Sequence, residues 1–450
     1  MRRFQLLIIV CCFMHSVSFA QEAEMKPCGT SVLHRHRVHL QKARPRAAND
    51  VETPPCFQGE KRGLVILMSF PNQPFQSNDT KKVWEAILNQ QGYHEHRAPG
   101  SVSDYFYDQS YHQFRLVFDV VGPVEAAHPY AYYGENKVWS PGDEFDKNDG
   151  ELIEEACRAA ADSISFADYD WDGDGDVDVV YVLFAGYGES DYYWIDDSVV
   201  WPHMGALSVD WADSYPDAIT LQGLRIDNYC CSNEITAQKE LTGLGTFCHE
   251  FSHSLGLPDL YNTLTGSSVL WYDDLMDCGN YNENGWCPPG YSSYERYACG
   301  WLTPEPIDDP HSLLNVPDSV KPLTPLIREP DVRIWRESEE SAEYYLIECR
   351  DTMSWDRSLS ANGLWAWRIN YDRQAWIDNL VNTDSSHYRV WRMRVEKIPS
   401  AIHNPLTSKQ QRNIVAVFDL QGYRYASLPA AVSGLYIIRY SDGSIRKVII

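Results

Sequence analysis

The segment from Gly243 to Asn262, "GLGTFCHEFSHSLGLPDLYN", constrains this chain more than any other part of it. Its apolar residues recur at helical spacing, so we expect a helix that is buried on one side. His249 and His253 are four residues apart, which places both imidazoles on one face of that helix, one turn apart. Two imidazoles in that arrangement can bind the same ion, and the pattern H-E-x-x-H predicts that this ion is Zn²⁺.

Glu250 is predicted to be the catalytic general base. It stands next to the first histidine, where it can take a proton from a zinc-bound water without binding the metal itself. Zinc lowers the pKa of such a water to about 7, so hydroxide is available near neutral pH. Downstream, Met276 in the stretch "DDLMD" is a candidate for a methionine turn beneath the metal.

The sequence offers two carboxylates as candidates for the third zinc ligand. A catalytic zinc site has three protein ligands and one open position for water or substrate. Gly256 allows the helix to stop and the chain to turn back, and Asp259 follows three residues later in the pattern "HExxHxxGxxD". Glu295, on a second predicted helix over residues 291–301, is the alternative, because some zincins take a glutamate from a following helix. The sequence favours Asp259.

A second acidic motif, "DYDWDGDGDVD" at residues 168–178, has an aspartate at every second position. Its opening matches a calcium loop of the D-x-D-x-D-G type, with Gly175 at the sharp turn. Tyr181 stands where an EF-hand would have its glutamate, so we predict a loop before a strand rather than an EF-hand. Adjacent carboxylates repel one another without a cation, which favours a structural Ca²⁺. The candidate ligands are Asp170, Asp172, Asp174, Asp176 and Asp178.

The remaining pattern predicts an α+β fold: a zincin-type metallopeptidase domain with a β-rich C-terminal extension and a short all-β tail. Strand-like apolar runs alternate with helical patterns in the first half, and Ser101 with an acidic residue three positions later predicts a capped helix. After residue 305 strand-like runs dominate. The expected strands include 63–70, 114–124, 177–186, 343–350 and 363–370, and the expected helices include 81–91, 101–110 and 150–163.

The N-terminus is typical of a signal peptide, with two arginines, an apolar run and the small-residue sequence Ser18-Phe19-Ala20. No other apolar run is long enough to span a bilayer, so we predict a secreted or cell-surface protein without a transmembrane segment. The net charge of −25 argues against nucleic acid as a partner. The predicted segments are a signal peptide (1–20), a propeptide or flexible lead-in (21–58), a zincin catalytic domain (59–305), its β-rich extension (306–400) and a β sorting-type tail (405–450).

The chain resembles the immune inhibitor A-like secreted metallopeptidases over roughly residues 60–385. The matching stretches include "KRGLVILMSFPNQPF", "YDWDGDGDVDVVYVLFAGYGES", "VVWPHM", "HEFSHSLGLPDLYN" and "DLMDCGNYN". The resemblance implies a zincin domain with zinc at His249 and His253, Glu250 as the base, structure stabilised by calcium, and proteolysis of extracellular proteins. One departure is Arg368-Ile369-Asn370, where the family usually has a histidine, an apolar residue and an aspartate. The last residues resemble the C-terminal sorting domains of type IX secretion, which implies secretion machinery as a partner.

The sequence thus predicts a secreted zinc metalloendopeptidase, a hydrolase acting on protein or peptide substrates; it leaves the oligomeric state open. The alternative is a catalytically inactive zincin-fold protein that binds at the cell surface. The intact set of His249, Glu250 and His253 argues against that alternative.

Overall fold

The structure is a computed structural model, and it describes most of the chain between residues 57 and 395 together with four strands of the C-terminal tail. The described ranges are 57–140, 143–192, 198–209, 218–314, 323–338, 341, 343–383, 389–395, 414–418, 424–425, 435–440 and 445–449. The predicted signal peptide and nearly all of the predicted lead-in lie outside them. The chain divides into two compact units, Met1–Lys397 and Ile398–Ile450. Among the described residues, no helix combines the length and the apolar character that a membrane span requires.

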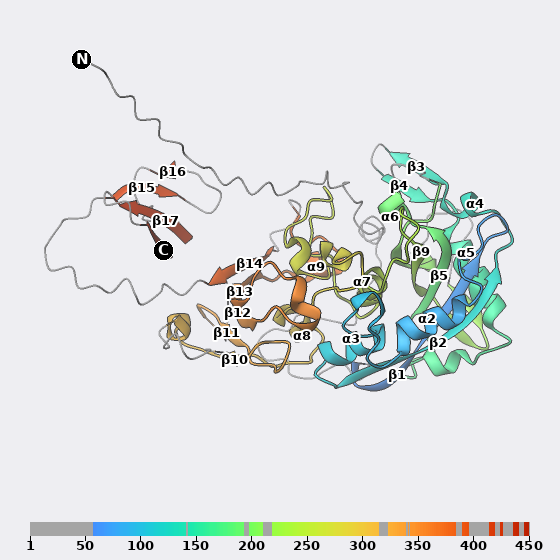
Figure 1. Ribbon diagram of the computed structural model, residues 1–450, viewed down its shortest axis with the longest axis horizontal. Helices are drawn as coiled ribbons and strands as arrows, with labels where there is room; N and C mark the ends of the chain where they lie inside the picture. Colours follow the sequence, from blue (N-terminus) through green and yellow to red (C-terminus); the bar gives the residue numbers. More distant parts are fainter. Residues whose placement is uncertain are drawn as a thin grey trace, which may run out of the picture. The chain divides into compact units, whose positions relative to one another are not determined.

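A five-stranded sheet forms the core of the first part of the first unit, on the right of Figure 1. The strand order is β2-β1-β5-β9-β6, and every neighbouring pair is parallel except β9 with β6, which runs antiparallel at the edge. The strands are β1 (Gly59–Ser69), β2 (Phe114–Glu125), β5 (Val180–Tyr187), β6 (His203–Ala206) and β9 (Asn228–Ile235).

Helices cover both faces of this sheet, which explains why its strands are continuously apolar. Side chains alternate between the faces, so Val65 and Leu67 of β1 enter one hydrophobic core while Leu64 and Ile66 enter the other. The first core also contains α2 (Thr80–Asn89), α3 (Val102–Gln109) and α7 (Gly245–Ser254). The second contains α4 (Tyr130–Gly134) and α5 (Asp149–Ala160). Smaller elements complete this region: α6 (Glu189–Tyr192), β3 (Asn136–Ser140), β4 (Asp143–Asp146), β7 (Ile219–Leu221) and β8 (Leu224–Ile226).

The predicted helix at residues 101–110 is confirmed as α3, and its cap is the predicted one. Ser101 Oγ accepts a hydrogen bond from the Asp104 N–H at 3.1 Å, and Asp104 Oδ2 accepts one from the Ser101 N–H at 3.0 Å. This capping box satisfies two backbone donors at the start of the helix. The strand predicted from Val177 begins only at Val180, because the residues before it belong to the aspartate loop.

A second five-stranded sheet follows residue 304, in the order β10-β11-β12-β13-β14. Trp365 and Trp367 of this sheet lie in the same hydrophobic core as α7, so the packing continues across residue 305. Arg368, which departs from the family pattern, forms a 2.6 Å ion pair with Glu343 on the neighbouring strand. The elements are α8 (Ser293–Ala298), β10 (Glu305–Pro306), β11 (Arg333–Trp335), β12 (Glu343–Arg350), β13 (Gly363–Asn370), α9 (Arg373–Ile377) and β14 (Arg389–Val395).

The described part of the second unit is a small antiparallel sheet with the order β16-β15-β17-β18. Its strands are β15 (Ile414–Phe418), β16 (Arg424–Tyr425), β17 (Leu435–Tyr440) and β18 (Ile445–Ile449).

Candidate metal centre

Helix α7 is held at its first residue by a close backbone contact. The Gly245 N–H donates to the Gly285 carbonyl at 2.8 Å, and a Cβ on Gly245 would lie 1.9 Å from the carbonyl oxygen of Asn280. Only glycine allows this approach, because a methyl group would overlap the neighbouring backbone. The contact fixes the start of the helix that carries both histidines.

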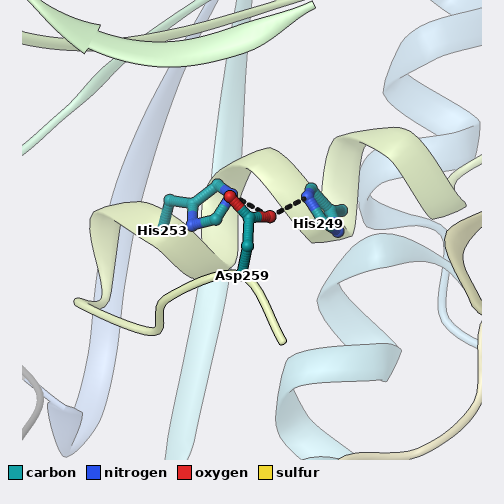
Figure 2. A group of neighbouring side chains, drawn as sticks. All are labelled: His249, His253 and Asp259. Atoms are coloured by element: carbon teal, nitrogen blue, oxygen red, sulfur yellow. Dashed lines mark ion pairs between the residues drawn. The ribbon is translucent and has the colours of Figure 1, made fainter. Parts of the chain in front are cut away.

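Both histidines of α7 direct their Nε2 atoms to one point (Figure 2). His249 Nδ1 is 2.7 Å from the Leu275 carbonyl oxygen, and His253 Nδ1 is 2.8 Å from that of Leu257. A carbonyl oxygen only accepts hydrogen bonds, so each Nδ1 carries a proton and each Nε2 of the neutral ring carries a lone pair. That is the tautomer a metal ligand requires. Met276 follows Leu275 directly and is buried, so the predicted methionine segment does lie against the first histidine.

Asp259 reaches the two imidazoles because the chain reverses at Gly256. Gly256 has φ +93°, its N–H donates to the His253 carbonyl at 2.8 Å, and the Leu257 N–H donates to the Ser252 carbonyl at 3.2 Å. This is a Schellman end to the helix, which the left-handed glycine permits. The segment after this turn brings Asp259 Oδ1 to 3.3 Å from His249 Nε2 and 3.4 Å from His253 Nε2.

These separations fit a single zinc ion. Ligands bound tetrahedrally at about 2.1 Å lie about 3.4 Å from one another. The three ligand atoms all lie within 4.8 Å of one another, and the three side chains are buried. Asp259 therefore occupies the position that the sequence analysis favoured for the third ligand. The alternative, Glu295, lies in the capping box of α8, where its Oε2 accepts from the Ser292 N–H at 2.7 Å and from its hydroxyl at 3.0 Å.

The charges in this group favour an ionised Asp259. Burial by itself would raise the pKa of Asp259, but the two imidazoles hold it far below its usual value. Glu250 is also fully buried, and burial raises its pKa although His249 and His253 act in the opposite direction. A carboxylate with a raised pKa accepts a proton from water more readily than an exposed one.

Asn379 positions Asp259 from the C-terminal extension. Its Nδ2 donates to Asp259 Oδ2 at 2.6 Å, and its Oδ1 accepts from the Asp259 N–H at 2.7 Å. This pair of bonds leaves Asp259 Oδ1 turned toward the histidines. The sequence analysis missed Asn379, because it stands 120 residues further along the chain and belongs to no recognisable motif.

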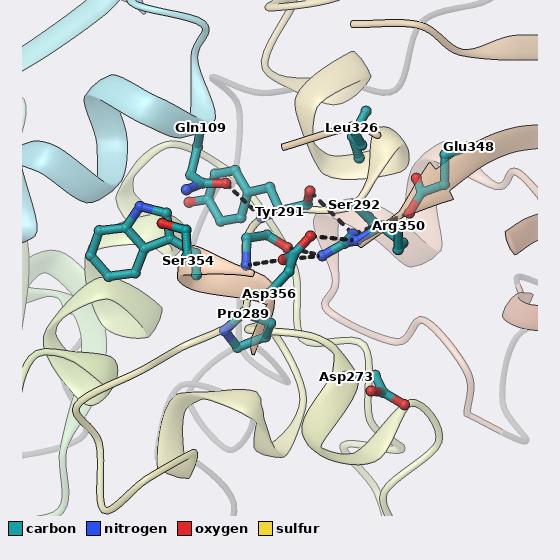
Figure 3. Close-up of polar contacts among 12 residues, drawn as sticks. Gln109, Asp273, Pro289, Tyr291, Ser292, Leu326, Glu348, Arg350, Ser354 and Asp356 are labelled. Carbon is teal, nitrogen blue, oxygen red and sulfur yellow. Dashed lines mark hydrogen bonds and ion pairs between the residues drawn. The ribbon is translucent and has the colours of Figure 1, made fainter. Parts of the chain in front are cut away.

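A buried polar network around Arg350 joins the extension to the segment before α8 (Figure 3). Arg350 of β12 is 1% exposed and is paired with Asp356 at 2.7 Å and Glu348 at 3.1 Å. Its Nη2 also donates to the Gly290 carbonyl at 2.8 Å. The neighbouring Tyr291 hydroxyl is hydrogen-bonded to the Ser252 hydroxyl of α7. Removing one partner would leave a buried charge uncompensated, so this network holds the extension firmly against the helix.

The aspartate loop gathers three of its five candidate carboxylates. Oxygens of Asp170, Asp172 and Asp178 lie within 4.8 Å of one another. The Asp176 carboxylate instead pairs with Arg225 at 3.1 Å, and Asp174 Oδ1 accepts from the Asp176 N–H at 2.9 Å. The five-residue calcium set therefore stays a prediction, and three of its carboxylates already lie close together.

A third group of ligating side chains was not predicted. Asp146, Asp149 and His203 are buried, and one ligand atom of each lies within 4.8 Å of the others. His203 belongs to the stretch "VVWPHM", which had no chemical interpretation in the sequence analysis. Sequence spacing could not reveal the group, because its members come from β4, α5 and β6.

Comparison with known proteins supports the resemblance noted in the sequence. The family model for the immune inhibitor A peptidase M6 catalytic domain matches residues 59–298, a range that contains all three groups. The chain is also similar to the pre-pro-metalloprotease PrtV of Vibrio cholerae serotype O1, in strains M66-2 and ATCC 39315 / El Tor Inaba N16961. Each is 25% identical over 276 residues, which covers 53% of this chain and 30% of the relative. The match therefore spans less than a third of the length of these relatives.

Proposed function

This chain belongs to the immune inhibitor A peptidase M6 family, and on that premise we propose that it is a secreted zinc-dependent endopeptidase acting on extracellular proteins. The observation that carries the proposal is the convergence of His249, His253 and Asp259 on one point, beside Glu250. The donor set of two imidazoles and one carboxylate is one that zinc accepts in peptidases. The fold class we propose with it is the zincin type.

In this proposal His249, His253 and Asp259 hold the zinc ion. When bound, zinc polarises the scissile carbonyl and makes water available as a nucleophile near neutral pH. Glu250 takes the proton of the attacking water and passes it to the nitrogen of the leaving amine. Its position directly after His249, on the helix that carries both imidazoles, supports that role. Asn379 keeps the Asp259 carboxylate oriented, and the two backbone carbonyls at the Nδ1 atoms keep the imidazoles in the correct tautomer.

The four central side chains are closed to solvent in this structure. His249 and His253 are 1% exposed, and Glu250 and Asp259 are 0% exposed.

Export and sorting remain part of the proposal. The signal-like N-terminus and the resemblance of the tail to type IX sorting domains support a secreted or cell-surface location, with secretion machinery as a partner of the tail. The division into a catalytic domain (59–305) and a β-rich extension (306–400) is proposed as one working unit, since Asn379 of the extension holds a ligand of the catalytic domain.

The function is tested by digestion of casein with the purified protein. We expect cleavage that 1,10-phenanthroline abolishes and that added Zn²⁺ restores. Cleavage that persists after complete removal of zinc would contradict the proposal. A protein that carries stoichiometric zinc and cleaves neither casein nor gelatin would favour the non-catalytic binding protein instead.

We also propose that the aspartate loop binds a structural Ca²⁺ through Asp170, Asp172 and Asp178. At a calcium concentration 100 times the dissociation constant, binding stabilises the folded state by about 2.7 kcal/mol. We expect calcium to raise the melting temperature at fixed zinc, and Asp172→Asn to remove most of this effect. Asp162→Asn is the matched control, because Asp162 is an exposed aspartate outside the loop. A melting temperature indifferent to calcium would rule the site out.

Asn379→Asp is expected to weaken zinc binding by about 10–100-fold, the usual cost of losing a residue that orients a metal ligand. The substitution keeps the acceptor for the Asp259 N–H, but it removes the Nδ2 donor and places a second carboxylate against Asp259. Asn382→Asp is the control, because Asn382 is also buried, also has a positive φ, and also donates through Nδ2, but to the Leu260 carbonyl. Zinc affinity is measured by competition with a chromogenic chelator. Equal affinities in the two variants would show that Asn379 does not position the ligand.

A further inference from the structure

The group formed by Asp146, Asp149 and His203 lies on the opposite face of the central sheet from α7. His203 of β6 pairs with Cys231 of β9, whereas the thiol of the preceding Cys230 donates to the Glu250 carbonyl at 3.2 Å. Successive residues of a strand point to opposite faces, so Cys231 and His203 lie on the side away from the candidate zinc centre. The two hydrophobic cores divide in the same way, since Cys230 belongs to one and Cys231 to the other.

The His203 ring has the same tautomer as the rings of His249 and His253, with an Nε2 that can bind a metal. Its Nδ1 is 2.6 Å from the Trp201 carbonyl oxygen, so the proton of the neutral ring lies on Nδ1. Its Nε2 is then an acceptor, and it lies 3.1 Å from Asp149 Oδ2 and 2.9 Å from the Tyr229 hydroxyl. The Tyr229 hydroxyl itself donates to Asp149 Oδ2 at 3.0 Å. Two lone pairs at 3.1 Å repel one another unless a cation or a proton lies between them.

A proton alone does not account for the other oxygens of the group. Asp146 Oδ2 accepts from the Trp201 N–H at 2.8 Å, but its Oδ1 and Asp149 Oδ1 accept no hydrogen bond and have no access to solvent. Asp146 is 7% exposed and Asp149 is 4% exposed. A buried carboxylate oxygen without any partner is unfavourable, and a bound cation would offset that cost.

Glu189 at the start of α6 adds a further carboxylate beside the group. It is 0% exposed, and its Oε1 accepts from Asn136 Nδ2 at 3.3 Å. Burial and then the charges of Asp149 and Glu189 raise the pKa of Asp146 well above its usual value. With all three carboxylates ionised, the group would hold a buried negative charge of two even if the imidazole were protonated, and the raised pKa of Asp146 reflects this repulsion. A dication bound to the neutral imidazole reduces it to one.

We propose that Asp146, Asp149 and His203, with Glu189 beside them, form a second metal site that binds a first-row transition-metal dication such as Zn²⁺ or Mn²⁺. The imidazole nitrogen separates this site from the aspartate loop, because Ca²⁺ takes oxygen ligands whereas Zn²⁺ and Mn²⁺ accept mixed nitrogen and oxygen donors. The site joins β4, α5, α6 and β6 on the face away from α7. Its role is structural: it ties the antiparallel edge strand of the sheet to the helices that cover that face.

The test is a metal count on the full-length protein by inductively coupled plasma mass spectrometry, after loading with Zn²⁺ or Mn²⁺ in a buffer that contains Ca²⁺. We expect Asp146→Asn and His203→Ala each to lower the transition-metal content by about one ion per chain, since losing a ligand weakens binding at least as much as losing an orienting residue. Asp146→Asn keeps the side-chain volume and the acceptor for the Trp201 N–H. His112→Gln, at an exposed histidine, is the control and should keep the wild-type content.

A second arm separates this site from the proposed catalytic one. His249→Ala should lose a different ion, so Mn²⁺ should still raise the melting temperature of this variant, and adding Asp146→Asn to it should remove that rise. This readout needs only the His249→Ala background to fold and no peptidase activity. Unchanged transition-metal content in both His203→Ala and Asp146→Asn would overturn the proposal. Loss of a calcium ion from them instead would overturn the assigned class of metal.

Discussion

Glu250→Gln is expected to reduce kcat for casein or a peptide substrate by about 10²–10⁴-fold, the contribution that a positioned general base usually makes. Glutamine keeps the size of the side chain and its hydrogen-bonding capacity but has no basic oxygen that could take a proton from water. Zinc content and melting temperature should stay at the wild-type values, because neither His249, His253 nor Asp259 is altered.

The control for this prediction is Glu240→Gln, an exposed glutamate in the turn after β9. It should leave kcat and zinc content unchanged. Wild-type cleavage by the Glu250→Gln protein would contradict the role of Glu250 as the base. Loss of zinc together with activity would show that Glu250 holds the centre together rather than moving a proton.

Asp259→Ala is expected to have the second-largest effect, which is loss of bound zinc and with it of peptidase activity. The substitution removes the oxygen that lies 3.3 and 3.4 Å from the two histidine Nε2 atoms. Without it only the two imidazoles remain as protein ligands of the zinc ion, and a site with two protein ligands binds zinc weakly. We expect the affinity to fall by more than the roughly 10–100-fold that loss of an orienting residue produces.

Glu295→Gln is the matched control, because Glu295 is the other carboxylate that the sequence offered for the third ligand. Glutamine at this position preserves an acceptor for the Ser292 N–H, so the capping box of α8 should survive. Zinc content should be full in Glu295→Gln and lost in Asp259→Ala. The reverse pattern would transfer the third-ligand role to Glu295.

Most of the candidate centre could be read from twenty consecutive residues. His249 and His253 lie one helix turn apart with Glu250 between them, and helical geometry alone brings the two imidazoles to one face. Gly256 and Asp259 follow so closely that a local Schellman turn suffices to return the carboxylate to the histidines. The capping box at Ser101 and the strands at 343–350 and 363–370 were predictable for the same reason, since each depends on neighbouring residues.

In the aspartate loop, contacts with distant residues could not be predicted from the local spacing. Alternation of aspartates predicted a shared cation site for five residues, and in the structure oxygens of Asp170, Asp172 and Asp178 lie within 4.8 Å of one another. Asp176 turns to Arg225, a residue 49 positions away that joins the loop through a backbone bridge. The competing ion pair is a tertiary contact, and the spacing within the loop contains no information about it.

The sequence by itself therefore determined the helix of paired histidines, the glutamate between them and the turn that returns Asp259, because hydrogen bonds within a few residues dictate all of these. Only the tertiary structure decided that Asn379 holds Asp259, that Arg350 of the extension binds the Gly290 carbonyl, and that Asp146, Asp149 and His203 meet on the far face of the sheet. These contacts join segments from about 50 to more than 100 residues apart. They form only when the folded chain packs the two faces of its sheet and closes the extension against α7, so no local pattern encodes them.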